Sequence, residues 1–157
     1  MVVLFFGQPA SGKTTIADFF VDTIQKEGDY FYDFIRIDGD KWRDITKNKD
    51  YSKEGRERNL KGAFDMALYL ETQDFIPVLS FVTPYEDMRK YLHDNCGELL
   101  TIYLEYSEDR GRNMNFATDF EQPMECDLKI NTSELGIKDC VNEVIKIFKP
   151  KIFKNEK

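Results

Sequence analysis

The chain has 157 residues, of which 41% are hydrophobic and 32% are charged, so it is long enough to bury one core of ordinary domain size. Lysine and arginine number 22 against 29 aspartate and glutamate residues, which gives a formal net charge of −7. Nucleic acids and anionic membrane surfaces bind basic patches, so this balance argues against both as partners. An anionic ligand would need a local cluster of basic groups.

No apolar run reaches the roughly 20 residues that a membrane-spanning helix needs. The apolar N-terminal run has no basic leader and no cleavage site. We therefore expect a cytoplasmic protein that does not contact membranes. Residues 1–150 are expected to form one domain, and residues 151–157 a frayed, charged tail. The sequence fixes no oligomeric state, and a homodimer stays open.

Short apolar runs alternate with segments of helical spacing, which is the pattern of an α/β fold. Strands are predicted over residues 2–6, 31–38, 75–82, 99–104 and 128–130. Helices are predicted over residues 13–26, after a capping signal at 50–52, from Thr83-Pro84 onward, and over 137–148, where Pro150 would end the last one. Five strands with helical crossovers predict a three-layer α/β/α arrangement around a five-stranded parallel sheet.

Residues 7–14 read Gly-Gln-Pro-Ala-Ser-Gly-Lys-Thr and fit the phosphate-loop pattern G-x-x-x-x-G-K-[ST]. The motif directly follows a buried strand and opens a helix, so backbone N–H groups and the helix N-terminus can hold phosphates. Lys13 is expected to reach the β- and γ-phosphates of ATP, and the Thr14 hydroxyl to ligate Mg²⁺. The predicted ATP-binding residues of this loop are Gly7, Ala10, Ser11, Gly12, Lys13, Thr14 and Thr15. This favours a P-loop nucleoside-triphosphate hydrolase fold over a chance glycine-rich turn.

The loop alone does not name the second substrate, because kinases, GTPases and motor ATPases share it. The chain has no N-K-x-D guanine signature, and its length leaves little room for the elements of a motor. A small nucleotide or metabolite kinase remains.

Two carboxylates, Asp38 and Asp40, flank Gly39 at the end of the second predicted strand, where open parallel sheets place their ligands. One could hold the Mg²⁺ shell while the other accepts the proton of an attacking hydroxyl. The pattern does not say which is the base. The alternative is an Asp-Gly turn with two solvated acids.

Arg56 and Asn59 share a helical face with the apolar residues Leu60 and Ala63, so both should point at the sheet edge. A guanidinium binds phosphate or sulfate oxygens in a bidentate way. Arg58 lies off this face. The alternative for Arg56 is a surface arginine paired with a nearby acid.

Taken together, these motifs resemble the adenylylsulfate kinase (APS kinase) family. The resemblance rests on the phosphate loop, on Asp38-Gly39-Asp40-x-x-Arg43, on Tyr51-Ser52 through Arg56-x-x-Asn59, and on residues 80–85 followed by Arg89. It covers most of residues 2–148 in the same order.

The resemblance implies transfer of the ATP γ-phosphate to the 3′-hydroxyl of adenosine 5′-phosphosulfate in sulfate assimilation, with Mg²⁺ as the cofactor. It implies Lys13, Asp38 and Asp40 as catalytic residues, and Thr14 and Asp38 as metal ligands. The implied acceptor-binding residues are Asp40, Arg43, Arg56, Asn59, Ser80, Phe81, Val82 and Phe116, with Phe116 stacked on the acceptor adenine.

The chain departs from the family at the lid, because residues 105–115 form a short bridge where the family has a longer basic segment. Arg110 and Arg112 are the only basic residues of this bridge. They are predicted to bind ATP in place of the lid, and solvated surface charges are the alternative. Two other functions stay open: a related kinase acting on another nucleotide-like hydroxyl acceptor, and a catalytically idle nucleotide-binding module.

Overall fold

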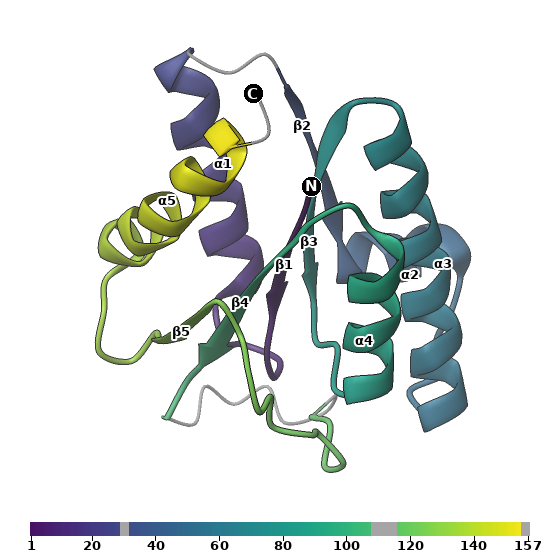
Figure 1. Ribbon diagram of the computed structural model, residues 1–157. Helices are drawn as coiled ribbons and strands as arrows, with labels where there is room; N and C mark the ends of the chain where they lie inside the picture. Colours follow the sequence, from purple (N-terminus) through teal and green to yellow (C-terminus); the bar gives the residue numbers. More distant parts are fainter. Residues whose placement is uncertain (29–31, 108–115, 155–157) are drawn as a thin grey trace.

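The computed structural model describes residues 1–28, 32–107 and 116–154, which contain both strands and helices (Figure 1). The strands are β1 (Val2–Phe6), β2 (Asp33–Asp38), β3 (Phe75–Phe81), β4 (Leu99–Glu105) and β5 (Leu128–Asn131). The helices are α1 (Lys13–Glu27), α2 (Gly39–Thr46), α3 (Lys53–Thr72), α4 (Glu86–Asn95) and α5 (Ile137–Lys154).

Within these residues the five strands form one parallel sheet in the order β2-β3-β1-β4-β5. Strand β1 lies at the centre with all five residues buried, as expected of a strand covered on both faces. The register pairs Asp38 of β2 with Ser80 of β3, and Phe6 of β1 with Phe81. The carboxyl ends of three neighbouring strands therefore meet at one edge of the sheet.

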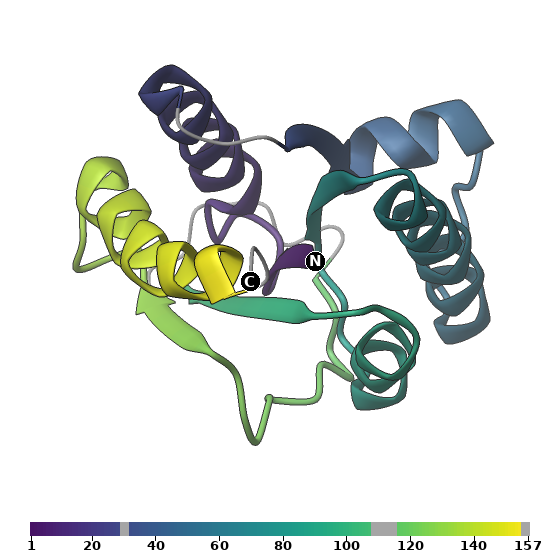
Figure 2. The same cartoon turned by 45° about the horizontal axis from the view of Figure 1, so that its top comes forward.

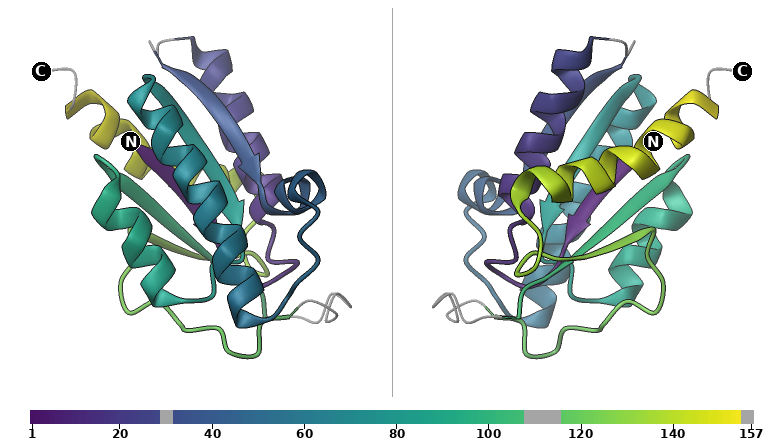
Figure 3. Two further views of the ribbon diagram at one scale, coloured as in Figure 1. Left: turned by 90° about the vertical axis from the view of Figure 1, so that its right-hand side faces the viewer. Right: turned by 90° about the vertical axis from the view of Figure 1, so that its left-hand side faces the viewer.

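Helices cover both faces of the sheet, so the molecule has three layers (Figure 2). On one face, α1 and α5 pack over Val3 and Phe5. On the other face, α3 and α4 pack over Val2, Leu4 and Phe6. Figure 3 shows each face in turn. This confirms the predicted three-layer fold with a five-stranded parallel sheet. In the described part of the chain, no helix is long and apolar enough to cross a membrane.

The structure corrects the sequence prediction at three places. Helix α2 was not predicted. None of its residues is buried, so its sequence has no apolar stripe that would indicate a helix. Helix α4 begins at Glu86 after Tyr85, so Pro84 precedes the helix and does not open its first turn. The predicted end of α5 at residue 148 is wrong, because the helix continues through Pro150 to Lys154.

Candidate active site

The phosphate loop joins β1 to α1, and its backbone requires glycine at two positions. Gly7 has a φ of 148°, and a Cβ there would collide with the carbonyl oxygen of Leu104. Gly12 has a φ of 92° and stands directly before α1. Both values lie where side chains are disfavoured. The chain can therefore curl around a phosphate group at the positively polarised end of the helix.

Lys13 is folded back onto this loop. Its Nζ donates to the carbonyl oxygen of Gln8 at 2.6 Å and to the Ser11 hydroxyl at 3.3 Å. Burial lowers the pKa of Lys13 to about 8, while the nearby carboxylates of Asp40 and Asp38 act in the opposite direction. The ammonium is therefore charged at neutral pH but poorly solvated. A bound phosphate would therefore stabilise this ammonium by supplying the interactions that water provides to an exposed lysine.

Asp38 is the buried centre of a hydrogen-bond network. Its Oδ2 accepts from the Thr14 hydroxyl at 2.7 Å and from the Ser80 hydroxyl at 2.9 Å. Its Oδ1 accepts the backbone N–H groups of Asp40 and Lys41 at the start of α2. Burial alone would raise the pKa of this carboxyl, but the hydrogen bonds outweigh it and hold the pKa below its ordinary value.

Arg36 supports this network from β2, although no sequence motif singled it out. Its Nη2 donates to the Ser80 hydroxyl at 2.9 Å, and its Nε donates to Asp18 of α1 at 2.7 Å. A guanidinium has no acceptor, so Ser80 must use its single proton on Asp38. The sequence did not indicate a role for Arg36, because a single charged residue in an apolar strand is usually interpreted as one that faces solvent.

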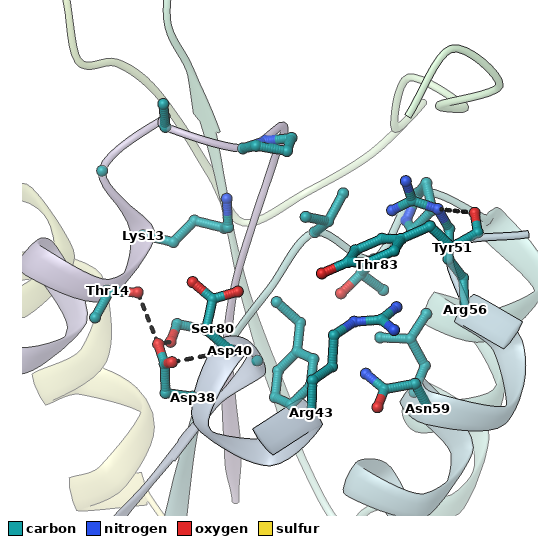
Figure 4. Close-up of a pocket in the computed structure, with 18 of the residues that line it drawn as sticks. Lys13, Thr14, Asp38, Asp40, Arg43, Tyr51, Arg56, Asn59, Ser80 and Thr83 are labelled. Atoms are coloured by element: carbon teal, nitrogen blue, oxygen red, sulfur yellow. Dashed lines mark hydrogen bonds between the residues drawn. The ribbon is translucent and has the colours of Figure 1, made fainter. Parts of the chain in front are cut away.

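Asp40 is the second residue of α2 and is exposed. In the close-up of Figure 4 its carboxylate stands between Lys13 and Asp38. Among the described residues its carboxylate oxygens have no hydrogen-bond donor, in contrast to those of Asp38. The two acids that look equivalent in the sequence therefore differ in burial and in bonding.

Arg43 and Arg56 converge on Tyr51, across the cavity from Lys13 (Figure 4). The guanidinium carbon of Arg43 lies 4.2 Å from the centre of the Tyr51 ring, and that of Arg56 lies 5.4 Å away. Arg56 is only 7% exposed, and its Nε donates to the Tyr51 carbonyl at 3.0 Å. Both cations are thus held in place within an acidic protein. Tyr51 stands in one of the motifs of the family resemblance, but its spacing predicted no role for its side chain.

A cavity of about 700 Å³ joins these groups. Two buried polar atoms in the residues that line it, Oδ1 of Asn59 and Oγ1 of Thr83, have no hydrogen-bond partner among the described residues. Buried polar atoms are normally paired, so these two mark positions where a bound molecule can supply a donor or an acceptor. Thr83 has a positive φ of 44°, which adds local strain at the same place.

The structure brings most predicted site residues to this cavity. Those that line it are Ala10, Gly12, Lys13, Thr14, Thr15, Asp38, Asp40, Arg43, Arg56, Asn59, Ser80, Phe81 and Val82. Gly7 and Ser11 belong to the phosphate loop but are not among the lining residues. Phe116 is 48% exposed and is not among the lining residues. Its predicted stacking on adenine stays a prediction. Arg110 and Arg112 lie outside the described residues.

Comparisons with known proteins agree with this arrangement. A family model described as adenylylsulphate kinase matches residues 1–117. The chain is 28% identical over 173 residues to the adenylyl-sulfate kinase of Halothermothrix orenii, covering 99% of this chain and 92% of that protein. It is 35% identical over 113 residues to a probable adenylyl-sulfate kinase of Aeropyrum pernix, covering 68% of this chain and 60% of that protein.

A solved structure shares the fold. The Mycobacterium tuberculosis APS kinase CysC, in complex with AMPPNP and APS, matches with a TM-score of 0.82 and 17% sequence identity, covering 94% of this chain and 96% of that chain. At 17% sequence identity, this similarity shows only that the two chains share a fold. The family match over residues 1–117 and the order of the motifs show that the chain belongs to the adenylylsulphate kinase family.

Proposed function

We propose that this chain is an ATP-dependent kinase that transfers the γ-phosphate of ATP to the 3′-hydroxyl of adenosine 5′-phosphosulfate. The observation that carries the proposal is one cavity with the phosphate loop and the acidic pair at one end and the cations Arg43 and Arg56 at the other. A nucleotide with an anionic tail fits the second end. Membership of the family supports the choice of acceptor.

In this mechanism Lys13 turns from Gln8 toward the phosphates and stabilises the charge on the transferred group. Asp40 accepts the proton of the attacking hydroxyl, because its oxygens are exposed while those of Asp38 already accept four hydrogen bonds. Arg56 and Arg43 hold the anionic groups of the acceptor. Asn59 and Thr83 pair with its polar edges.

The donor set at this end of the cavity fits Mg²⁺. The described residues contain no cluster of three His, Cys, Asp or Glu side chains that would form a complete metal cage. Mg²⁺ does not need one, because it is commonly held by one or two protein oxygens together with phosphates and waters. Thr14 and Asp38 would provide those oxygens. When bound, the ion neutralises charge on the β- and γ-phosphates.

Two further expectations from the sequence stay predictions: that Arg110 and Arg112 contribute to ATP binding, and that the protein acts in the cytoplasm. A homodimer stays open, and the mass of the protein in solution, measured by light scattering, tests it. A hexameric APS kinase from Thiobacillus denitrificans contains a region of the same fold, with a TM-score of 0.77 and 21% identity over 96% of this chain and 29% of that chain.

A coupled assay of ADP release tests the function. With Mg²⁺ and ATP, adenosine 5′-phosphosulfate is expected to stimulate ADP release, and its 3′-phosphorylated product is expected by mass spectrometry. Arg56→Ala should raise the KM for the acceptor about ten- to a hundredfold, since a hydrogen bond to a charged group contributes about 1.5–3 kcal/mol. Affinity for ADP should stay unchanged.

Arg58→Ala is the matched control, because Arg58 lies two residues further along α3 and is exposed. It should leave the acceptor KM at the parent value. If calorimetry finds no binding of adenosine 5′-phosphosulfate to the parent protein, the acceptor assignment is wrong. If no nucleotide acceptor stimulates ADP release at all, the protein is an idle nucleotide-binding module.

A further inference from the structure

Gln8 of the phosphate loop pairs with a residue 109 positions further along the chain. Its Nε2 donates to the carbonyl oxygen of Ala117 at 2.7 Å, and the N–H of Ala117 donates to Gln8 Oε1 at 3.1 Å. The side-chain amide thus satisfies both backbone groups of one residue, as a neighbouring strand would. Two parallel bonds fix the orientation of the amide, and neither leucine nor glutamate can form both of them.

Gln8 also contacts the catalytic lysine through its main chain. The ammonium of Lys13 donates to the Gln8 carbonyl at 2.6 Å. A phosphate that draws the Lys13 ammonium away from this carbonyl, as in the mechanism above, therefore acts directly on Gln8, whose side chain is bonded to Ala117. Only two residues, Lys13 and Gln8, therefore separate a bound nucleotide from Ala117.

Residues 117–122, which we call the strap, lie along the acceptor side of the molecule. Tyr85 donates its hydroxyl to Asp119 at 2.9 Å, and the N–H of Glu121 donates to the Pro84 carbonyl at 2.8 Å. Pro84 itself lines the cavity. The strap is thus bonded at one end to the phosphate loop and at the other to the loop after β3 that forms the acceptor side.

A second glutamine anchors the strap without touching the phosphate loop. Gln122 accepts the hydroxyl proton of Tyr103, on β4, at 2.9 Å. It supplies a comparison within the molecule: both glutamines hold the same strap, but only Gln8 joins it to the residues that meet the nucleotide.

We propose that Gln8 is a positioning residue that couples the phosphate loop to the strap, so that nucleotide and acceptor raise each other's affinity. The inference rests on the proposed function for the identity of the acceptor. The coupling is reciprocal, because a gain in one affinity must equal the gain in the other. Two neutral hydrogen bonds correspond to a coupling of about tenfold.

Calorimetry on the full chain tests the coupling. The dissociation constant of adenosine 5′-phosphosulfate is measured with and without saturating Mg²⁺-ADP, a pair of ligands that cannot react. In the parent protein, ADP is expected to tighten acceptor binding about tenfold. Gln8→Leu should abolish this ratio, and Gln8→Glu should do so too because its carboxylate repels the Ala117 carbonyl. Gln122→Leu should weaken acceptor binding equally in both conditions and keep the ratio.

Hydrogen exchange gives a readout that does not depend on the acceptor. Mg²⁺-ADP alone should slow amide exchange severalfold in peptides that cover the strap of the parent and of Gln122→Leu, and leave it unchanged in Gln8→Leu. Thermal denaturation shows whether each variant is folded. If adenosine 5′-phosphosulfate does not bind the parent, the proposed function fails while exchange still decides the role of Gln8. Equal slowing of exchange in Gln8→Leu and in the parent would overturn the inference.

Discussion

At the scale of single residues, the two carboxylates around Gly39 have different environments. Asp38 is 8% exposed and accepts four hydrogen bonds, whereas Asp40, in the first turn of α2, is exposed. The hydrogen bonds that outweigh burial keep the pKa of Asp38 low, so Asp38 remains ionised and is a poor proton acceptor at neutral pH. The division of roles between metal holder and base follows from that difference.

Asp40→Asn should therefore lower kcat by about 10²–10⁴, the usual contribution of a positioned general base, while the KM for ATP stays close to the parent value. Asp38→Asn should instead raise the Mg²⁺ concentration needed for half-maximal activity and lower the Tm. An amide has one accepting oxygen where the carboxylate has two, so its NH2 group would face either the Thr14 and Ser80 hydroxyls or the backbone N–H groups of Asp40 and Lys41. Steady-state kinetics and thermal denaturation measure both.

Asp44→Asn is the matched control, since Asp44 follows Asp40 by one turn on α2 and is also exposed. It should match the parent in kcat, in Mg²⁺ requirement and in Tm. Parent-like turnover in Asp40→Asn would contradict its role as the base, and parent-like turnover in both Asp40→Asn and Asp38→Asn would mean that the acidic pair is only a helix-capping turn.

The sequence could predict the residues of this site far better than their contacts. Lys13, Thr14 and the acidic pair stand in motifs whose spacing is set by the chemistry of phosphate binding. Arg36 stands in no motif, and Gln8 occupies a variable position of the phosphate-loop pattern. Their contacts depend on register between β2 and β3 or on chain segments more than 100 residues apart, and only the tertiary structure brings these together.

At the scale of elements, the same limit applies to helix ends. The capping signal at Ser52 predicted the start of helix α3, and the Ser52 hydroxyl accepts a hydrogen bond from the N–H of Gly55, as expected of an N-cap. Helix α5 was misjudged because proline usually ends a helix. The helix passes Pro150 because Ile152 beyond it is 2% exposed and belongs to the cluster formed by α1, α5 and the sheet. Tertiary burial overrides the local signal.

Ile152→Ala should accordingly lower the free energy of unfolding by about 2–5 kcal/mol, the usual range for deleting a buried isoleucine side chain. Phe153→Ala, at a neighbouring position that is 45% exposed, should cost clearly less. Urea denaturation followed by circular dichroism measures both. Equal losses in the two variants would show that residues 151–154 form a frayed tail, as the sequence suggested.

At the scale of the whole molecule, an acidic chain holds anionic substrates by concentrating its cations. The net charge is −7, yet Lys13, Arg43 and Arg56 line one cavity. The parallel sheet makes this arrangement possible, because the carboxyl ends of β1, β2 and β3 lie side by side. Composition argues against a broad basic surface and predicts such a local cluster, and the fold determines where the cluster lies.

Binding at this cavity should stabilise the entire fold. At a concentration one hundred times its Kd, a ligand that binds only the native state adds about 2.7 kcal/mol. In a domain of this size, each 1 kcal/mol raises the Tm by roughly 2–4 °C, so Mg²⁺-ADP should raise the Tm of the parent by about 5–10 °C. Differential scanning fluorimetry measures the shift.

Lys13→Met should lose most of the shift, and its unliganded Tm at pH 7 should be at least as high as that of the parent. Burial lowers the pKa of Lys13 to about 8, so below that pH the folded state contains a poorly solvated ammonium, which lowers the free energy of unfolding. Stability lost to this charge is regained as the pH rises from about 8 toward the ordinary lysine pKa, and methionine removes the charge altogether. Lys26→Met, at an exposed position of α1, should keep both the parent Tm and the ADP shift. If Lys13→Met keeps the full ADP-induced rise in Tm, the assignment of Lys13 to the phosphates is wrong. If the variant has a higher unliganded Tm but a smaller ADP shift, Lys13 is a residue that serves binding at a cost in stability.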